Sequence, residues 1–128
     1  MRTPEELRYT EDHEWLRPAG KSGRMGITDF AQDQLGDIVF VELPEVGRQV
    51  KQGEALGVVE SVKSVSDVFA AVGGKVLAVN QELVEKPELV NQDPYGQGWI
   101  VEIEIADESE VAALLDAAKY EPLQEGGH

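Results

Sequence analysis

The segment "ALGVVESVKSVSDVFAAV" (residues 55–72) consists of two apolar stretches separated by a short polar turn, with one lysine, Lys63, at its centre. Valine-containing apolar stretches on both sides of such a turn are typical of two antiparallel strands. A lysine in a turn is most often a solvated surface residue and nothing more. The segment therefore predicts a hairpin with Lys63 at its tip, and only its context can give that lysine a function.

On both sides of this hairpin, short apolar segments alternate with glycines, which is typical of a β-sandwich or barrel. A faint internal repeat lies within them, because Gly47 and Val50 recur as Gly73 and Val76 at the same spacing. Only two copies are present, so the repeat favours two similar half-units over a solenoid. We expect a mainly β fold of two similar halves that meet at the segment containing Lys63.

Towards the N-terminus, the sequence predicts a second hairpin, a helix and a strand. Residues 13–18 and 23–28 are candidate strands joined by a small, polar turn. Residues 28–37 read as a short helix whose first amide groups Thr28 or Asp29 can cap, with Gly36 near its end. Residues 38–43 are β-branched and aromatic, which predicts a buried strand.

The C-terminal third predicts mixed structure. Residues 80–98 favour a short helical turn followed by an irregular loop, because Pro87 and Pro94 interrupt regular structure. Residues 99–105 alternate apolar and acidic side chains, as a half-buried strand does. Residues 107–120 carry apolar side chains at helical spacing after a polar cap, which predicts a C-terminal helix.

The composition indicates one folded domain without redox chemistry of its own. A chain of 128 residues with 41% apolar content can bury one core, so residues 1–128 are treated as a single domain. The chain has no cysteine, which excludes disulfides and thiolate ligands. Its formal net charge of −14 disfavours nucleic acid and anionic membranes as partners. No apolar run could span a bilayer and no signal or transit peptide is recognisable, so we expect a cytoplasmic, bacterial-like protein.

Motifs of common enzymes and metal sites fail on residue type or spacing. The histidines are His13 and His128, and neither an HExxH motif nor a calcium-binding loop is present, so no metal site is expected. The segment "AGKSGR" ends like a phosphate-binding loop, but Trp15 stands where that motif needs glycine. The sequence therefore predicts a protein that is not an enzyme. A lysine amine can, however, be converted into an amide that carries an imported group.

Several segments, in the same order, resemble the H-protein family of the glycine cleavage system. They are "HEW" (13–15), "GITDFAQDQLGDIVFVELPEVG" (26–47), "ESVKSVSD" (60–67), "GGKVLAVN" (73–80), "ELVNQDPYGQGWI" (88–100) and "DESE" (107–110). The resemblance extends from Tyr9 to about Tyr120, which would form the core of a lipoyl-carrier domain. It implies a barrel-sandwich hybrid of the lipoyl/biotinyl-like type, with short flanking helices and a C-terminal helix.

In that family the lysine that matches Lys63 carries lipoate in amide linkage, so the resemblance implies lipoate as the cofactor. The implied partners are a pyridoxal-phosphate glycine decarboxylase, a tetrahydrofolate-dependent aminomethyltransferase, dihydrolipoamide dehydrogenase and a lipoate-attaching enzyme. The arm would carry the aminomethyl group of glycine from the first enzyme to the second, and the third would reoxidise it. A carrier that presents one arm to several enzymes has no need to self-associate, so we expect a monomer.

The resemblance also implies roles for three acidic residues. Glu14 and Asp67 match family positions near a cleft that receives the loaded arm, where a carboxylate can pair with an ammonium group. Such a cleft would exclude water from a hydrolysis-prone group. Glu60 lies shortly before Lys63 and would be recognised by the lipoate-attaching enzyme. Each of the three could instead be an ordinary exposed acid.

Other functions compete with this interpretation. A biotinyl carrier has a related architecture, but its lysine lies between methionines, whereas Lys63 lies between Val62 and Ser64. A lipoyl domain of a 2-oxoacid dehydrogenase would be shorter and would lack the N-terminal hairpin, the helix over 28–37 and the C-terminal helix. The alternatives left open are a lipoyl donor or relay in protein lipoylation without glycine cleavage, and an unmodified acidic domain that binds proteins.

Overall fold

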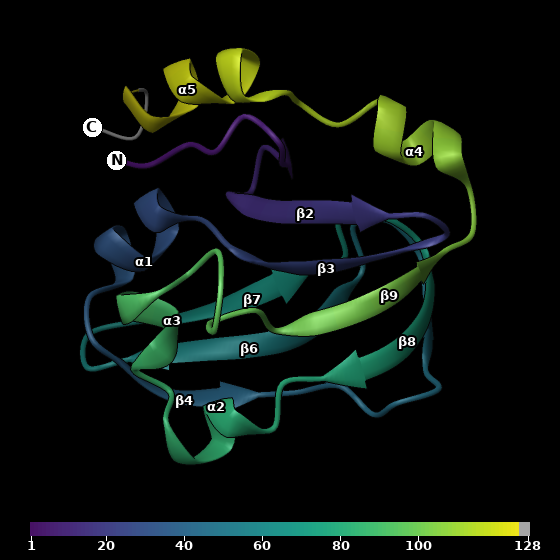
Figure 1. Ribbon diagram of the computed structural model, residues 1–128. Helices are drawn as coiled ribbons and strands as arrows, with labels where there is room; N and C mark the ends of the chain where they lie inside the picture. The colour runs from purple at the N-terminus through teal and green to yellow at the C-terminus, as the bar shows by residue number, and fades with distance from the viewer. Residues whose placement is uncertain (126–128) are drawn as a thin grey trace.

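The computed structural model describes residues 1–125, which form two antiparallel β-sheets with short helices around them (Figure 1). The strands are β1 (Arg8–Tyr9), β2 (Glu14–Ala19), β3 (Ser22–Ile27), β4 (Ile38–Glu42), β5 (Gln49–Val50), β6 (Ala55–Ser61), β7 (Val65–Phe69), β8 (Gly74–Val79) and β9 (Val101–Ile105). The helices are α1 (Asp29–Leu35), α2 (Glu82–Glu85), α3 (Leu89–Gln92), α4 (Glu108–Ala112) and α5 (Ala117–Glu125). The predicted mainly β fold is confirmed, as two open sheets that do not close into a barrel.

The six-stranded sheet has the order β1-β2-β3-β9-β8-β5. Its β2 and β3 pair from Glu14 opposite Ile27 to the end of the hairpin, which confirms the predicted N-terminal hairpin. The predicted alternation in β9 is also confirmed, because Val101 and Ile103 are buried and Glu104 is exposed. This sheet therefore joins the N-terminal hairpin to the C-terminal part of the chain.

The two copies of the internal repeat lie side by side in this sheet. Strands β5 and β8 pair antiparallel, with Val50 opposite Gly74. The Gly47 amide donates to the carbonyl of Val76 at 2.8 Å, and Gly47 has a φ of 96°, which glycine adopts without strain. The two copies therefore meet along β5 and β8, and the segment that contains Lys63 connects them instead of lying between them.

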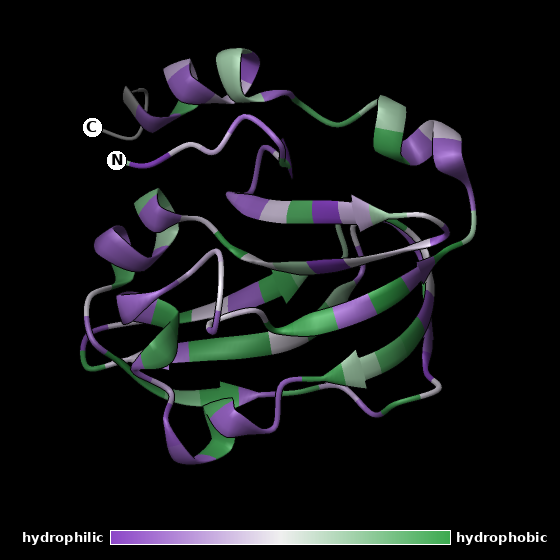
Figure 2. Cartoon of the chain, in the orientation of Figure 1, coloured by the Kyte–Doolittle hydropathy of each residue, from purple (hydrophilic) through white to green (hydrophobic). Residues whose placement is uncertain are grey.

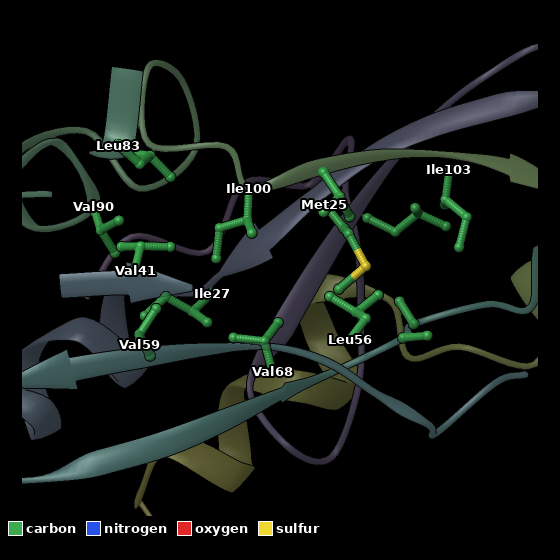
Figure 3. Packing of buried hydrophobic residues seen from close by; sticks show 14 of the residues in the cluster. Met25, Ile27, Val41, Leu56, Val59, Val68, Leu83, Val90, Ile100 and Ile103 are labelled. Carbon is green, nitrogen blue, oxygen red and sulfur yellow. The ribbon is translucent and has the colours of Figure 1, made fainter. Parts of the chain in front are cut away.

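The inner face of the three-stranded sheet, of order β4-β6-β7, packs on the larger sheet. Their buried side chains form one core, labelled in Figure 3, to which the larger sheet contributes Met25, Ile27 and Ile103, the smaller sheet Val41, Leu56, Val59 and Val68, and the helices Leu83 and Val90. Burial of each such side chain contributes roughly 1.5–3 kcal/mol. The core thus anchors the smaller sheet by one face.

A second, aromatic cluster holds the two ends of the chain against the larger sheet. The rings of Tyr9 and Tyr120 stack with their centroids 4.5 Å apart. Trp15 is fully buried and donates its indole N–H to the carbonyl of Pro94 at 2.9 Å. As a result, α5 lies next to the N-terminal segment beyond β2 (Figure 1).

The predicted helices are correct at α1 and need correction near the C-terminus. Thr28 caps α1 by accepting a hydrogen bond from the Ala31 amide, as predicted. A C-terminal helix is confirmed, but its predicted extent over 107–120 is wrong, because Leu115 pairs with Tyr9 through two backbone hydrogen bonds and separates α4 from α5. Residues 80–98 contain two short helices, α2 and α3, where the sequence predicts one helical turn. No helix within residues 1–125 is long and apolar enough to cross a membrane.

The strand predicted over 38–43 exists as β4, but the prediction that it is buried is wrong. Ile38 and Val41 are buried, whereas Val39 is 51% exposed and Phe40 is 52% exposed. Strand β4 lies at the edge of the smaller sheet, and a register shift between Ile38 and Phe40 interrupts its pairing with β6. The β-branched and aromatic composition of residues 38–43 therefore predicts the strand correctly. It does not indicate which face of the strand is buried.

Candidate functional site

The turn between β6 and β7 places Lys63 at one end of the smaller sheet. The Ser61 hydroxyl oxygen accepts hydrogen bonds from the backbone amides of Lys63 at 3.2 Å and Ser64 at 3.0 Å. The Ser61 amide in turn donates to the Ser64 carbonyl at 2.8 Å. Serine side chains that accept from the following amides are common in tight turns. The largely buried Ser61 therefore fixes the backbone on either side of an exposed Lys63.

A further backbone hydrogen bond holds this turn against the start of β4. The Val62 amide donates to the carbonyl of Asp37 at 3.1 Å, beside the connection from α1 to β4 (Figure 1). The Cε atom of Lys63 lies 3.3 Å from the place that a Cβ atom would take at Gly36. The missing side chain at Gly36 thus leaves room for the methylene chain of Lys63 along the end of α1.

The Lys63 ammonium group has no carboxylate partner within residues 1–125. The ion pairs of this part of the chain join Arg2 to Asp29, Arg24 to Glu102 and Arg48 to Glu54. A lysine has to be accessible and give up its proton before it can be acylated, and a paired carboxylate would oppose both. The surroundings of Lys63 therefore suit a covalent modification.

Glu60 lies on the outer face of the smaller sheet. It stands opposite Phe40 on β4 and opposite Val65 on β7, and its side chain is exposed. Its carboxylate is therefore accessible to another protein that approaches Lys63, which lies in the adjoining turn.

Glu14 is buried, with 2% of its surface exposed, and both carboxylate oxygens are hydrogen-bonded. The Thr10 hydroxyl donates to one oxygen at 2.7 Å, and the Phe69 amide donates to the other at 3.1 Å. Burial raises the pKa of Glu14 to about 7, and these two hydrogen bonds oppose the rise. The carboxyl group therefore changes its protonation state near neutral pH.

Glu14 lines a cavity of about 250 Å³. The walls of this cavity come from residues 9–12 before β2, residues 52–53 before β6, residues 69–71 at the end of β7 and residues 113–115 between α4 and α5. A buried acid with a strongly shifted pKa in a cavity is typical of a functional site. The structure thus places Glu14 where it can contact a bound cationic group.

Asp67 lies in a different hollow from Glu14. It is exposed, stands opposite Val58 on β6, and shares its hollow with residues 42–48. Along β7, Asp67 comes before Phe69, the residue whose amide contacts Glu14. Glu14 on β2 thus contacts the strand that carries Asp67, but the two acids line different hollows.

Sequence reasoning missed Thr10 and Tyr120. No motif points to Thr10, although its hydroxyl holds the Glu14 carboxylate. The Tyr120 hydroxyl lies 2.7 Å from Nδ1 of His13 and 2.7 Å from the Thr28 hydroxyl, so it joins α5 to the start of α1. Burial lowers the pKa of His13, whose φ of 68° lies in the left-handed region.

His13 therefore has a structural role, since its ring contacts the Tyr120 hydroxyl. His128, the other histidine, lies outside the described residues. Within the part of the chain that is described, no group of three histidine, cysteine, aspartate or glutamate side chains is placed to hold a metal ion.

A family model matches almost the whole chain, including the residues of both sites described above. The model described as "Glycine cleavage H-protein" matches residues 7–126, which include the Glu14 cavity and the Lys63 turn. The chain belongs to this family. The resemblance found in the sequence is therefore confirmed.

Proteins with the same name are similar over nearly the whole chain. The "Glycine cleavage system H protein" of Symbiobacterium thermophilum is 56% identical over 124 residues, which are 97% of each chain. That of Carboxydothermus hydrogenoformans is 53% identical over 95% of this chain and 94% of the relative. A crystal structure of the glycine cleavage system H protein from Mycobacterium marinum is 40% identical, with a TM-score of 0.87 over 98% of this chain and 99% of the other.

Membership in the H-protein family supports a carrier role in glycine cleavage. The similarity to the Mycobacterium marinum structure also agrees with the arrangement of two antiparallel sheets and C-terminal helices described above.

Proposed function

We propose that this chain is the non-catalytic carrier of a cytoplasmic bacterial glycine cleavage system, with lipoate in amide linkage to Nζ of Lys63. The observation that carries the proposal is an exposed lysine that forms no ion pair within residues 1–125, in a turn that Ser61 and Asp37 hold in place. When bound, the lipoyl group supplies a dithiol–disulfide pair that can carry the aminomethyl group of glycine and then electrons. The chain itself supplies the rigid turn that presents it.

The residues around Lys63 fit this modification. Amide formation removes the positive charge of the lysine, and no carboxylate partner within residues 1–125 loses an ion pair as a result. The space above Gly36 accepts the lysine methylene groups before and after modification. We therefore expect the turn to keep its geometry when Lys63 is acylated.

Glu14 and its cavity are the proposed binding site for the ammonium end of the loaded arm. The Thr10 hydroxyl and the Phe69 amide hold the carboxylate in position, and burial excludes water from it. A cation that enters the cavity favours the ionised carboxylate, so binding would release the proton that Glu14 holds below about pH 7. Asp67, further towards Lys63 along β7, would interact with the arm outside the cavity.

The proposed partners are the enzymes that use such an arm. The carrier would present it to a pyridoxal-phosphate glycine decarboxylase, then to a tetrahydrofolate-dependent aminomethyltransferase, and finally to dihydrolipoamide dehydrogenase for reoxidation. A lipoate-attaching enzyme would first recognise Glu60 and modify Lys63. The net charge of −14 favours basic docking surfaces on these partners. One carrier chain at a time suffices for each encounter, so we propose a monomer.

Exchange of carbon dioxide into glycine by a glycine decarboxylase tests the proposal. Wild-type carrier and Lys63→Arg are first incubated with a lipoate–protein ligase, lipoate and ATP, and Lys75→Arg serves as the control because Lys75 is an exposed lysine on β8. We expect exchange with wild-type carrier and Lys75→Arg, and none with Lys63→Arg. Exchange supported by Lys63→Arg would contradict the proposal. Lipoylation of Lys63 without exchange would instead support a lipoyl relay.

A further inference from the structure

The outer face of the smaller sheet exposes apolar side chains beside the Lys63 turn. Phe40, Glu60 and Val65 form one row across β4, β6 and β7, because Phe40 stands opposite Glu60 and Glu60 opposite Val65. Phe40 is 52% exposed and Val65 is 64% exposed. Val62, within the turn itself, is 71% exposed. We call these four residues the docking row.

A second row on the same face is mostly acidic. Glu42 stands opposite Val58, and Val58 opposite Asp67, further from the turn. The neighbouring side chains Val41 and Val59 point to the opposite face and are buried in the core. The exposure of Phe40, Glu60 and Val65 is thus a consequence of strand alternation in an anchored sheet, and Val62 is exposed because it lies in the turn.

This combination is unusual for a surface with no partner. Figure 2 shows hydrophobic residues along β4 and β6, in the sheet whose outer side chains are exposed. Apolar side chains gathered on a protein surface and surrounded by charged ones are typical of a protein–protein interface. A second copy of this chain is a poor occupant, because Glu42, Glu60 and Asp67 would meet like charges on a chain of net charge −14.

The enzymes that handle the carrier differ in how close to Lys63 their reaction takes place. Enzymes that act on the far end of a lipoyl arm can reach it at a distance from the turn. Attachment is different, because the new amide bond forms at Nζ of Lys63 while the bond between the lipoyl carbonyl and its activating group breaks. The lysine ammonium loses two protons in this acyl transfer, and no oxidation or reduction occurs. The attaching enzyme therefore has to enclose Lys63 and contact the side chains next to it.

We propose that the docking row binds the enzyme that attaches lipoate to Lys63. Phe40, Val62 and Val65 provide an apolar contact, and Glu60 pairs with a basic side chain of that enzyme. The acids of the second row, Glu42 and Asp67, favour further basic side chains around this contact. This inference rests on the proposed function, since it assumes that Lys63 is the lipoylated residue.

The rate of lipoate attachment at varied carrier concentration tests the docking row. The assay uses unmodified carrier, a lipoate–protein ligase, lipoate and ATP, with Phe40→Ser and Val65→Ser as variants. Leu77→Ser is the control, because Leu77 is an exposed apolar residue on β8, in the larger sheet and away from both rows. We expect kcat/KM to fall about tenfold in each docking-row variant and to stay within about twofold of wild type in Leu77→Ser. Equal thermal unfolding midpoints would show that all four proteins are folded.

Three further results complete the test. Variants lipoylated to completion by long incubation should support glycine decarboxylase exchange at the wild-type rate, and an equal defect there would overturn the assignment to the attaching enzyme. Unchanged kcat/KM in Phe40→Ser and Val65→Ser would overturn the docking row but not the proposed function, which would fail only if wild-type Lys63 is not modified. A wild-type dimer that Phe40→Ser dissociates would place a second copy on this face and overturn the inference.

Discussion

The Lys63 turn and the Glu14 cavity differ in how their charged groups are accommodated. At the turn, every hydrogen bond involves the backbone or Ser61, and the lysine side chain itself is exposed without an ion pair in the described chain. At the cavity, the Glu14 side chain is buried and both carboxylate oxygens are hydrogen-bonded. Lys63, the residue proposed to be modified, is therefore accessible. Glu14, the residue proposed to bind the aminomethyl group, is already held in position by hydrogen bonds before that group arrives.

This difference has an energetic consequence. An exposed charge in a turn keeps its hydration, so its replacement changes stability little. A buried carboxyl group is costly to ionise, so its protonation state is coupled to folding. Variants at the turn should therefore affect function without affecting stability, and variants at the cavity should affect both.

Lys63→Arg gives the largest expected effect and acts on function alone. Arginine keeps the positive charge but cannot form the lipoyl amide, so glycine cleavage in a reconstituted system should be lost completely. The unfolding temperature should change by no more than about 2 °C, as for a surface substitution. A large drop in that temperature would show that the side chain of Lys63 stabilises the fold, and would contradict the claim that variants at the turn affect function alone.

The pH dependence of the free energy of unfolding should show that Glu14, unlike Lys63, is a buried ionisable residue. Because its pKa is raised from 4.5 to about 7, the folded chain holds this proton more tightly than the unfolded chain does. The resulting stabilisation is full below pH 4.5 and is lost as pH rises through about 7, and it amounts to about 3 kcal/mol.

Glu14→Gln should remove this pH-dependent contribution. Urea unfolding of wild type and variant between about pH 4, just below the ordinary pKa of 4.5, and about pH 9, well above the raised pKa of about 7, measures the difference. Asp67→Asn is the control, since Asp67 is exposed. Parallel stability curves for wild type and Glu14→Gln would contradict the burial of an ionisable group at this position.

Glu14→Ala should also shorten the lifetime of the aminomethyl group on loaded, isolated carrier. Loss of a charged hydrogen-bond partner for the ammonium group corresponds to about a tenfold faster hydrolytic release. Release of formaldehyde or ammonia over time measures it, with Asp67→Asn compared in parallel. An unchanged lifetime in Glu14→Ala would show that the cavity does not shield the group.

Ser61→Ala should have the smallest effect and should act on the turn. The substitution removes the acceptor for the Lys63 and Ser64 amides, which should lower the free energy of unfolding by about 1 kcal/mol. Ser66→Ala is the matched control, because the Ser66 hydroxyl bonds only to the carbonyl of its neighbour Asp67. Equal losses in the two variants, measured by urea unfolding, would show that Ser61 does not fix the turn.

Local signals in the sequence were sufficient for the hairpins and for α1. The turn around Lys63 and the cap at Thr28 depend on residues close in sequence, so turn and capping preferences predict them. The family resemblance added the meaning of Lys63. Its place at an exposed tip follows from the alternation of strands on either side.

The features that sequence reasoning missed depend on residues far apart in the chain. The C-terminal helix is split because Leu115 pairs with Tyr9, and Glu14 is buried beside the Phe69 amide. Phe40 is exposed because no element within residues 1–125 covers that face of its sheet, which its own β-forming character does not reveal. Such long-range contacts leave no periodic pattern in the sequence.

The most direct test of the account is the mass of the protein isolated from its own cells, followed by peptide mapping across residues 52–75. We predict the mass increment of one lipoyl group, located on Lys63. An unmodified Lys63 in cells that lipoylate other proteins would contradict the proposed carrier function, and a biotin increment on Lys63 would contradict the proposed cofactor.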